Sequence, residues 1–380
     1  MLRRVPPPAP EAGADELPSP LEERLITLIK ANGPMTVADY MSDALFHPQY
    51  GYYTSQSPFG TLGDFTTSPE ISQIFGELIG LWLVQSWIDM GEPDFFHLVE
   101  LGPGRGVLME DIIRASAIRP EFKKAARIWL VETSGRLRHE QQKRLRHLDP
   151  EIAWKDRLED VPEGPLLLVA NEMLDCLPVR QFIMTEDGWR ERMVNVNETG
   201  DALAFSTAFA PPLNAPKLPP ADDYRKGDIF ELCQPANDLT EAIASRVTSQ
   251  KGRALIVDYG HIRAGAGDTL QAVKNHAAWP VLRAPGTADI TAHVNFSQLT
   301  DSVFDCGAAA HGPLTQGDFL RRLGLETRVA KLSAGKPEHV VQDIQSAAFR
   351  ICAPSQMGEI FKALCISSPG LATPAAFDPR

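Results

Sequence analysis

The chain has 380 residues, of which 43% are hydrophobic, so it is long enough for one large domain or two ordinary ones. Its formal net charge is −12, and because an acidic surface repels phosphate, we expect a cationic partner such as an arginine-bearing protein and no nucleic acid. The five cysteines form no CxxC pair and no apolar run is long enough to cross a bilayer, so we predict no metal site, no disulfide framework and no membrane insertion.

The N-terminal part of the chain combines a tail with helices. Residues 1–20 are rich in Pro and Ala and predict a disordered tail. Apolar residues of helical period follow over 21–32, and residues 36–46 predict a second helix capped by a threonine. A Ser-Pro-Glu start predicts one long apolar helix over 68–90.

The middle of the chain alternates between strand and helix patterns. A strand pattern that recurs between helices predicts a parallel, doubly wound α/β sheet. The predicted strands are 95–101, 126–131, 152–154, 166–170 and 254–257, and the predicted helices between the first of them are 106–117 and 134–148.

Segments with other sequence patterns interrupt this alternation. Residues 182–196 alternate around an Asp-Gly pair and 202–209 alternate again, which predicts inserted hairpin strands. A helix is predicted over 234–250, and residues 261–295 predict a long loop of the kind that forms functional lids. The predicted organisation is a tail (1–20), an N-terminal helical cap (21–95), a main domain (96–365) with insertions at about 182–233 and 262–315, and a second tail (366–380).

A glycine-rich segment, Glu100-Leu101-Gly102-Pro103-Gly104-Arg105-Gly106, lies where the first predicted sheet strand meets a helix. Glycines allow the backbone to turn tightly there and to present its N–H groups to a ligand. The motif alone is also compatible with a plain tight turn. The strand before it and the apolar helix after it favour a ligand-binding loop.

The residues around the loop indicate which ligand it binds. Val107 occupies the place of the last glycine in the dinucleotide fingerprint. Glu100 would repel a pyrophosphate but suits the ammonium group of a methionine moiety. The pattern E-x-G-x-G-x-G is typical of enzymes that use S-adenosylmethionine, so we predict this cofactor.

Two acidic residues at the ends of the next strands are candidate cofactor contacts. Glu132 ends the second strand, where a carboxylate can accept hydrogen bonds from ribose hydroxyls. Asp156 follows the third strand and is predicted to accept from the adenine amino group. The alternatives are an acid at a helix start for Glu132 and a surface turn for Asp156.

The fourth strand ends in Asn171, Glu172 and Asp175, at the edge where ligands of open α/β sheets bind. We predict that Asn171 lies at the cofactor and that Glu172 and Asp175 are catalytic. Two acids with i, i+3 spacing on the first turn of a helix would share one face and could orient a guanidinium for methyl transfer. Capping of the helix by these acids is the alternative.

The segment before residue 70 also leads into a helix N-terminus. Asp64, Thr67 and Ser68 are predicted to help hold the carboxylate of the methionine moiety on exposed N–H groups, with simple helix capping as the alternative. The roles of His261 and His293 are left open.

Five motifs in chain order resemble those of one known family. They are Gly63-Asp64-Phe65-Thr66-Thr67-Ser68-Pro69-Glu70-Ile71, the glycine loop, Asn171-Glu172-Met173-Leu174-Asp175-Cys176-Leu177-Pro178-Val179, Asp258-Tyr259-Gly260-His261 and Asp289-Ile290-Thr291-Ala292-His293-Val294. Together they resemble the MidA-like family of S-adenosylmethionine-dependent methyltransferases, which includes the mitochondrial complex I assembly protein arginine methyltransferase. The resemblance covers residues 21–365 and departs from the family at Asn295, where Asp is usual.

The resemblance implies a Rossmann-like class I methyltransferase sheet with an N-terminal helical region and an inserted β-hairpin and loop subdomain. It also implies symmetric dimethylation of a protein arginine on a respiratory NADH dehydrogenase subunit or a similar protein, with cofactor contacts from Glu100, Gly102, Gly104, Gly106 and Glu132. The alternatives are a non-catalytic assembly factor and a nucleotide-dependent oxidoreductase. Because residues 1–20 contain acids and no apolar core, we expect a cytoplasmic bacterial relative; a homodimer is left open.

Overall fold

The computed structural model describes residues 18–55, 66–148, 151–210 and 218–378. These residues form two compact units. The first draws its described residues from 1–65, 175–236 and 264–293, and the second from 66–174, 237–263 and 294–380. The helical cap predicted for residues 21–95 is therefore divided between the units. The predicted tail of residues 1–20 lies almost entirely outside the described part.

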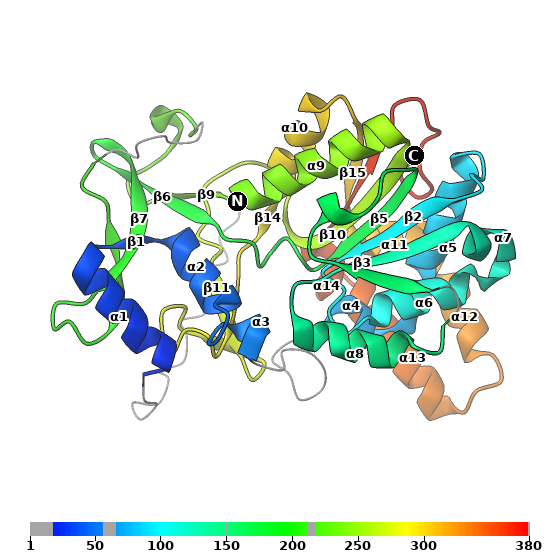
Figure 1. Ribbon diagram of the computed structural model, residues 1–380, viewed down its shortest axis with the longest axis horizontal. Helices are drawn as coiled ribbons and strands as arrows, with labels where there is room; N and C mark the ends of the chain where they lie inside the picture. The colour runs from blue at the N-terminus through cyan, green and yellow to red at the C-terminus, as the bar shows by residue number, and fades with distance from the viewer. Residues whose placement is uncertain (1–17, 56–65, 149–150, 211–217, 379–380) are drawn as a thin grey trace. The chain divides into compact units, whose positions relative to one another are not determined.

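The second unit is built on a sheet whose described strands follow the order β15-β16-β10-β5-β2-β3-β4, with β14 paired to β10 (Figure 1). The strands from β4 to β10 are parallel, and β16 and β15 are antiparallel to their neighbours. The strands are β2 Phe96–Leu101, β3 Ala126–Val131, β4 Ile152–Lys155, β5 Leu166–Asn171, β10 Gly252–His261, β14 Val294–Asn295, β15 Ala309–Thr315 and β16 Phe361–Ser367. The predicted α/β fold is confirmed.

The central strands of this sheet form because their sequences are rich in apolar residues. Every residue of β2 and β5 is buried, and a strand covered on both faces loses the alternation of polar and apolar residues. In Figure 1, α9 and α10 lie on one side of the sheet and α6 and α8 on the other. The helices of this unit are α4 Ser68–Ile71, α5 Gln73–Asp89, α6 Val107–Ala115, α7 Pro120–Ala125, α8 Gly135–Leu145, α9 Gln234–Gln250 (all but its first turn), α10 Phe296–Asp305, α11 Gln316–Arg322, α12 Leu325–Ser333, α13 Glu338–Cys352 and α14 Met357–Ile360.

The order of the strands creates a switch point at the centre of the sheet. From β2 the chain proceeds to β3 and β4 on one side, and then returns to place β5 on the other side of β2. Leu101 pairs with Ala170, so the carboxyl ends of these two parallel strands lie side by side. Ligands of open α/β sheets bind at such a point, which is where the glycine loop and Glu172 follow their strands.

The long helix predicted over residues 68–90 is wrong in one respect, because it is interrupted at Ser72. The Ser72 backbone is extended, with φ of −152° and ψ of 121°, and its Oγ accepts a hydrogen bond from Ile74 N at 3.3 Å. The serine therefore ends the short α4 and caps α5. An N-capping side chain competes with continuation of the helix, and here it prevails.

The first unit contains the N-terminal helices and most of the inserted segments. Residues 182–196 form the predicted hairpin, in which Thr185 pairs with Gly188. Its larger described sheet has the order β1-β7-β6-β9, with β8 paired to β7. Its elements are α1 Pro20–Asn32, β1 Met35–Thr36, α2 Val37–Phe46, α3 Tyr52–Ser55, β6 Arg180–Thr185, β7 Gly188–Val196, β8 Leu203–Thr207 and β9 Ile229–Leu232.

The loop predicted over residues 261–295 is wrong, because three of its segments pair into a small sheet of order β12-β11-β13. These strands are β11 Gln271–Lys274, β12 Ala277–Trp279 and β13 Asp289–Thr291. They are too short to show a period in the sequence. The segment is also held by Thr269, whose N donates to half-buried Glu231 Oε1 at 3.0 Å, a contact between residues distant in the chain.

Within the described residues, none of the helices is long and apolar enough to span a membrane.

Candidate functional site

The glycine loop joins β2 to α6 at the switch point of the sheet. Gly102, Gly104 and Gly106 have φ of +61°, +52° and +79°, a region that side chains with a Cβ rarely adopt. The loop is held at its start by the Gly102 N–H, which donates to the Val131 carbonyl at 3.1 Å. The predicted strand, tight turn and helix are confirmed, and α6 begins at Val107 directly after the last glycine.

Glu132 lies beside this loop at the end of β3, and its carboxyl group is buried. Ser134 N donates to Oε1 at 2.8 Å, and Gln141 Nε2 donates to Oε2 at 3.4 Å. Burial raises the pKa of Glu132, and these hydrogen bonds partly offset that effect because they favour the ionised form. The carboxylate is thus fixed in direction at the position where the sequence predicts a ribose contact.

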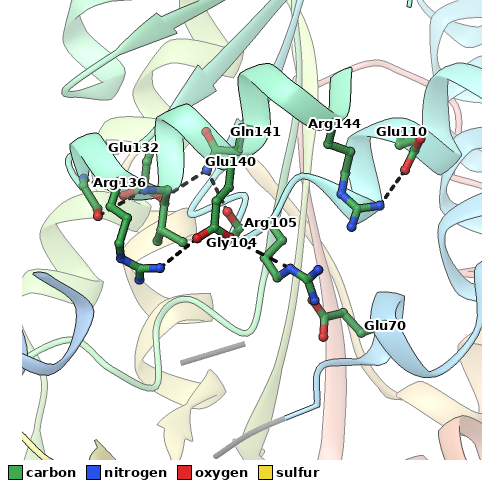
Figure 2. A network of polar contacts seen from close by, with 11 residues as sticks. Glu70, Gly104, Arg105, Glu110, Glu132, Arg136, Glu140, Gln141 and Arg144 are labelled. Carbon is green, nitrogen blue, oxygen red and sulfur yellow. Dashed lines mark hydrogen bonds and ion pairs between the residues drawn. The ribbon is translucent and has the colours of Figure 1, made fainter. Parts of the chain in front are cut away.

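Gln141 links Glu132 to the loop itself, as Figure 2 shows. It lies on α8, and its Nε2 also donates to the Gly104 carbonyl at 2.8 Å. The sequence reasoning missed this residue. Its only signal is a polar residue in register with Leu137 and Leu145 on the buried face of the helix.

A row of charged side chains borders the loop on the side of α4 and α8 (Figure 2). Arg105 lies 3.4 Å from Glu70 and 4.0 Å from Glu140, measured between nitrogen and oxygen, and Glu140 also pairs with Arg136 at 2.8 Å. Arg105 belongs to the glycine loop, so these pairs connect the loop to both helices. Such half-exposed pairs contribute little stability each.

Asp156 lies after β4 with its side chain 70% exposed. Its Oδ1 accepts from Arg138 at 2.6 Å, and Arg138 Nε in turn donates to the Glu132 carbonyl at 2.6 Å. The arginine therefore ties Asp156 to the end of β3. The adenine contact stays a prediction for this residue.

Glu100 is a buried carboxyl group on β2, directly before the loop. Burial raises its pKa to about 8, although a hydrogen bond from the Met109 backbone partly opposes this. Its Oε2 is buried and has no hydrogen-bond partner among the residues that the structure describes. A buried acceptor without a partner is costly, and a ligand that brings an ammonium group would satisfy it. The residues present therefore fit the predicted cofactor.

Glu172 follows β5 in a left-handed conformation with φ of +51°, which is uncommon outside glycine. Its Oε1 accepts from Ser68 N at 2.7 Å and from Asn171 Nδ2 at 3.1 Å. Buried Ser68 Oγ and Asn171 Oδ1 have no hydrogen-bond partner in the described part of the chain. Polar groups from α4 and β5 therefore converge at this end of the sheet.

The helix expected after β5 is absent, so the expectation that Glu172 and Asp175 share one helical face is wrong. Among the described residues, 172–179 form turns and extended chain. Asp258 on β10 explains the conformation, because its Oδ2 accepts from Met173 N at 3.1 Å and Leu174 N at 2.9 Å. A fully buried carboxylate here replaces the hydrogen bonds that a helix would have provided.

The other predicted site residues are placed as follows. Thr67 is the N-cap residue of α4 but makes no side-chain cap hydrogen bond. Asp64 lies outside the described residues. Asp175 belongs to the first unit, where it is buried and its carbonyl accepts from Ala292 N at 2.9 Å. His261 is half-buried, and burial lowers its pKa.

Known proteins resemble this chain over most of its length. A family model described as "Putative S-adenosyl-L-methionine-dependent methyltransferase" matches residues 78–314. The mitochondrial protein arginine methyltransferase NDUFAF7 of Danio rerio is 38% identical, over 90% of this chain and 85% of that one. The same protein of Mus musculus is 39% identical, over 90% of this chain and 83% of that one.

A solved structure resembles the whole fold. The crystal structure of a protein from Burkholderia thailandensis that is described as a "likely methyl transferase", bound to S-adenosyl-homocysteine, superposes with a TM-score of 0.81. It is 26% identical and covers 95% of this chain and 97% of that one. S-adenosyl-homocysteine is what remains of S-adenosylmethionine after its methyl group has been transferred. The chain therefore belongs to the MidA-like family of S-adenosylmethionine-dependent methyltransferases, and S-adenosylmethionine is its cofactor.

Proposed function

We propose that this chain transfers methyl groups from S-adenosylmethionine to a protein arginine, with symmetric dimethylation as the product. The observation that carries the proposal is the family relationship: the Danio rerio and Mus musculus relatives are named protein arginine methyltransferases and match 90% of the chain. We further propose an NADH dehydrogenase subunit or a similar protein as the acceptor. A cytoplasmic location and a homodimer complete the proposal, and cell fractionation and light scattering test them.

We assign the cofactor to the glycine loop. The N–H groups of Gly104 and of the first turn of α6 would bind it, because a helix N-terminus carries unpaired donors. The N–H groups of Gly102 and Gly106 donate to the Val131 and Pro103 carbonyls, so these two glycines would contribute by letting the backbone approach the cofactor closely. Glu100 would accept from the methionine ammonium group, and Glu132 from the ribose hydroxyls. Thr67, Ser68, Asn171 and Asp156, which belong to the same unit as the loop, remain proposed contacts. Asp64, which lies outside the described residues, also remains a proposed contact.

We assign the acceptor end to Glu172. The cofactor supplies a methyl group on a sulfonium, which a guanidinium nitrogen takes as the N–C bond forms and the S–C bond breaks. A guanidinium nitrogen has no available lone pair until a carboxylate accepts its N–H and polarises it. Ser68 N and Asn171 Nδ2 hold the Glu172 carboxylate in one direction, so it can orient the acceptor and take up its proton.

A methyl-transfer assay tests this assignment. The acceptors are proteins from cells that lack this chain, and the product is identified by amino-acid analysis after incubation with isotopically labelled S-adenosylmethionine. We expect symmetric dimethylarginine with the wild type. Glu172→Gln should lower kcat by at least about a hundredfold while S-adenosyl-homocysteine still binds. Asp175→Asn is measured alongside it.

The matched control is Glu186→Gln, which removes a surface carboxylate whose side chain is 79% exposed. It should transfer methyl groups at the wild-type rate. Full activity of Glu172→Gln would refute the role of this carboxylate. Cofactor binding by the wild type without any transfer would instead favour a non-catalytic assembly factor, and binding of a nicotinamide dinucleotide in place of S-adenosylmethionine would favour an oxidoreductase.

A further inference from the structure

Gln141 is a fully buried amide on the inward face of α8. A polar group in that position is tolerated only when its hydrogen bonds are made. Gln141 makes them with three separate parts of the second unit. Its Nε2 donates to the Gly104 carbonyl at 2.8 Å and to Glu132 Oε2 at 3.4 Å, and its Oε1 accepts from Trp154 Nε1 at 2.8 Å.

The chemistry of these partners requires an amide at this position. The indole N–H of Trp154 can only donate, so it faces the oxygen of the amide. The Gly104 carbonyl and the Glu132 carboxylate can only accept, so they share the two N–H groups of Nε2. A carboxylate or an apolar side chain of the same size would leave at least two buried groups without a partner.

Both acceptors belong to the parts of the site that we assign to the cofactor. Because a peptide unit is planar and trans, fixing the Gly104 carbonyl also fixes the N–H of Arg105, which points the opposite way. The hydrogen bond to Oε2 fixes the second oxygen of Glu132, whose first oxygen is already held by Ser134 N. One side chain thus sets the direction of a loop N–H and of the Glu132 carboxylate (Figure 2).

We propose that Gln141 is a positioning residue for the cofactor, which holds the glycine loop and Glu132 in the geometry that binds S-adenosylmethionine. The proposal rests on the placement of the cofactor at the glycine loop. It assigns no direct contact with the cofactor to Gln141. The affinity for the cofactor should therefore depend on the ability of residue 141 to donate hydrogen bonds, and not only on its volume.

The test is Gln141→Glu, titrated calorimetrically with S-adenosyl-homocysteine at pH 5.5 and pH 9.5. The higher pH is needed because burial beside Glu132 raises the pKa of the new carboxyl group, as burial does for Glu100. An ionised glutamate keeps the size and the bond from Trp154, but it repels the Gly104 carbonyl and Glu132. A protonated glutamate regains one donor. We expect the variant to bind at least about tenfold more weakly than the wild type at pH 9.5. At pH 5.5 the dissociation constant of the variant should lie clearly closer to that of the wild type.

Two further variants keep the test decisive. Gln141→Met has a similar size and no donor at any pH, so its weaker binding should not recover in acid, and it replaces the first variant if that does not fold. Gln316→Glu is the matched control, because Gln316 is also fully buried and donates to a backbone carbonyl, that of Ile351, at 2.7 Å. It contacts neither the loop nor Glu132 in the described structure and should bind as the wild type does.

The outcomes distinguish a failure of the role of Gln141 from a failure of the cofactor placement at the glycine loop. Wild-type affinity in both Gln141 variants would overturn the positioning role, as would a loss in Gln141→Glu that is equal at both pH values. An equal loss in Gln316→Glu would also overturn it, because the effect would then be one of general stability. If the wild type itself does not bind S-adenosyl-homocysteine, the placement of the cofactor fails first.

Discussion

At the scale of single residues, some residues of the candidate site could be predicted from the sequence next to them, and others could not. The glycines of the loop and Glu100 could be predicted because a strand, a tight turn and a helix follow one another within a few residues. Glu132 followed from its place at the end of the next strand. Gln141 could not be predicted, because its role depends on Gly104 and Trp154, which lie 37 and 13 residues away in the chain.

Glu100 makes a prediction about pH. Burial raises its pKa to about 8, so below that pH the carboxyl group is largely protonated in the protein without ligand. An ammonium group binds better to the ionised form, and binding should therefore release a proton. We expect the affinity for S-adenosyl-homocysteine to rise between pH 6 and pH 8, by up to about tenfold per pH unit.

Calorimetric titrations of the wild type and Glu100→Gln across this range measure the effect. The variant cannot ionise at this position and should show a flatter profile, with weaker binding at pH 8. If both proteins have the same slope, Glu100 does not receive the ammonium group.

At the scale of elements, the sequence indicated the buried strands well and the turn after β5 badly. The acids of the segment Asn171-Glu172-Met173-Leu174-Asp175 resemble the first turn of a helix. The structure has a left-handed residue there instead, because Asp258 captures the N–H groups of Met173 and Leu174. That contact spans 84 residues and has no local signal. Likewise, Ser72 interrupts a helix whose composition alone predicts continuity.

Asp258 is therefore predicted to hold the turn that presents Glu172. Asp258→Asn keeps the shape but removes the charge and one acceptor oxygen, so it should lower the free energy of unfolding by about 1–3 kcal/mol. Chemical denaturation measures this loss, and amide hydrogen exchange should become faster at Met173 and Leu174. Asp301→Asn, at an exposed site on α10, is the control and should change neither quantity. Unchanged exchange in Asp258→Asn would contradict the assignment.

At the scale of the whole molecule, the alternation of strands and helices predicted the parallel sheet, because its buried strands are rich in apolar residues. The antiparallel strands β15 and β16 and the division into two units were not predicted. β16 pairs with β10, more than a hundred residues earlier in the chain, and the first unit assembles three separate segments of sequence. Pairing between such distant segments produces no local pattern in the sequence that would predict it. The sequence motifs and the overall fold both indicate a methyltransferase family.

We propose that the glycine loop binds S-adenosylmethionine for methyl transfer to a protein arginine. Mass spectrometry of methylarginine tests this in proteins that co-purify with the chain, expressed as the wild type or as Gly104→Val in cells that lack it. Valine is strained at the φ of +52° found at residue 104 and would place a branched side chain in the loop. We expect symmetric dimethylarginine on a co-purifying protein with the wild type, and its loss with a variant that remains folded. Methylarginine at equal levels with both proteins, or with neither, would contradict it.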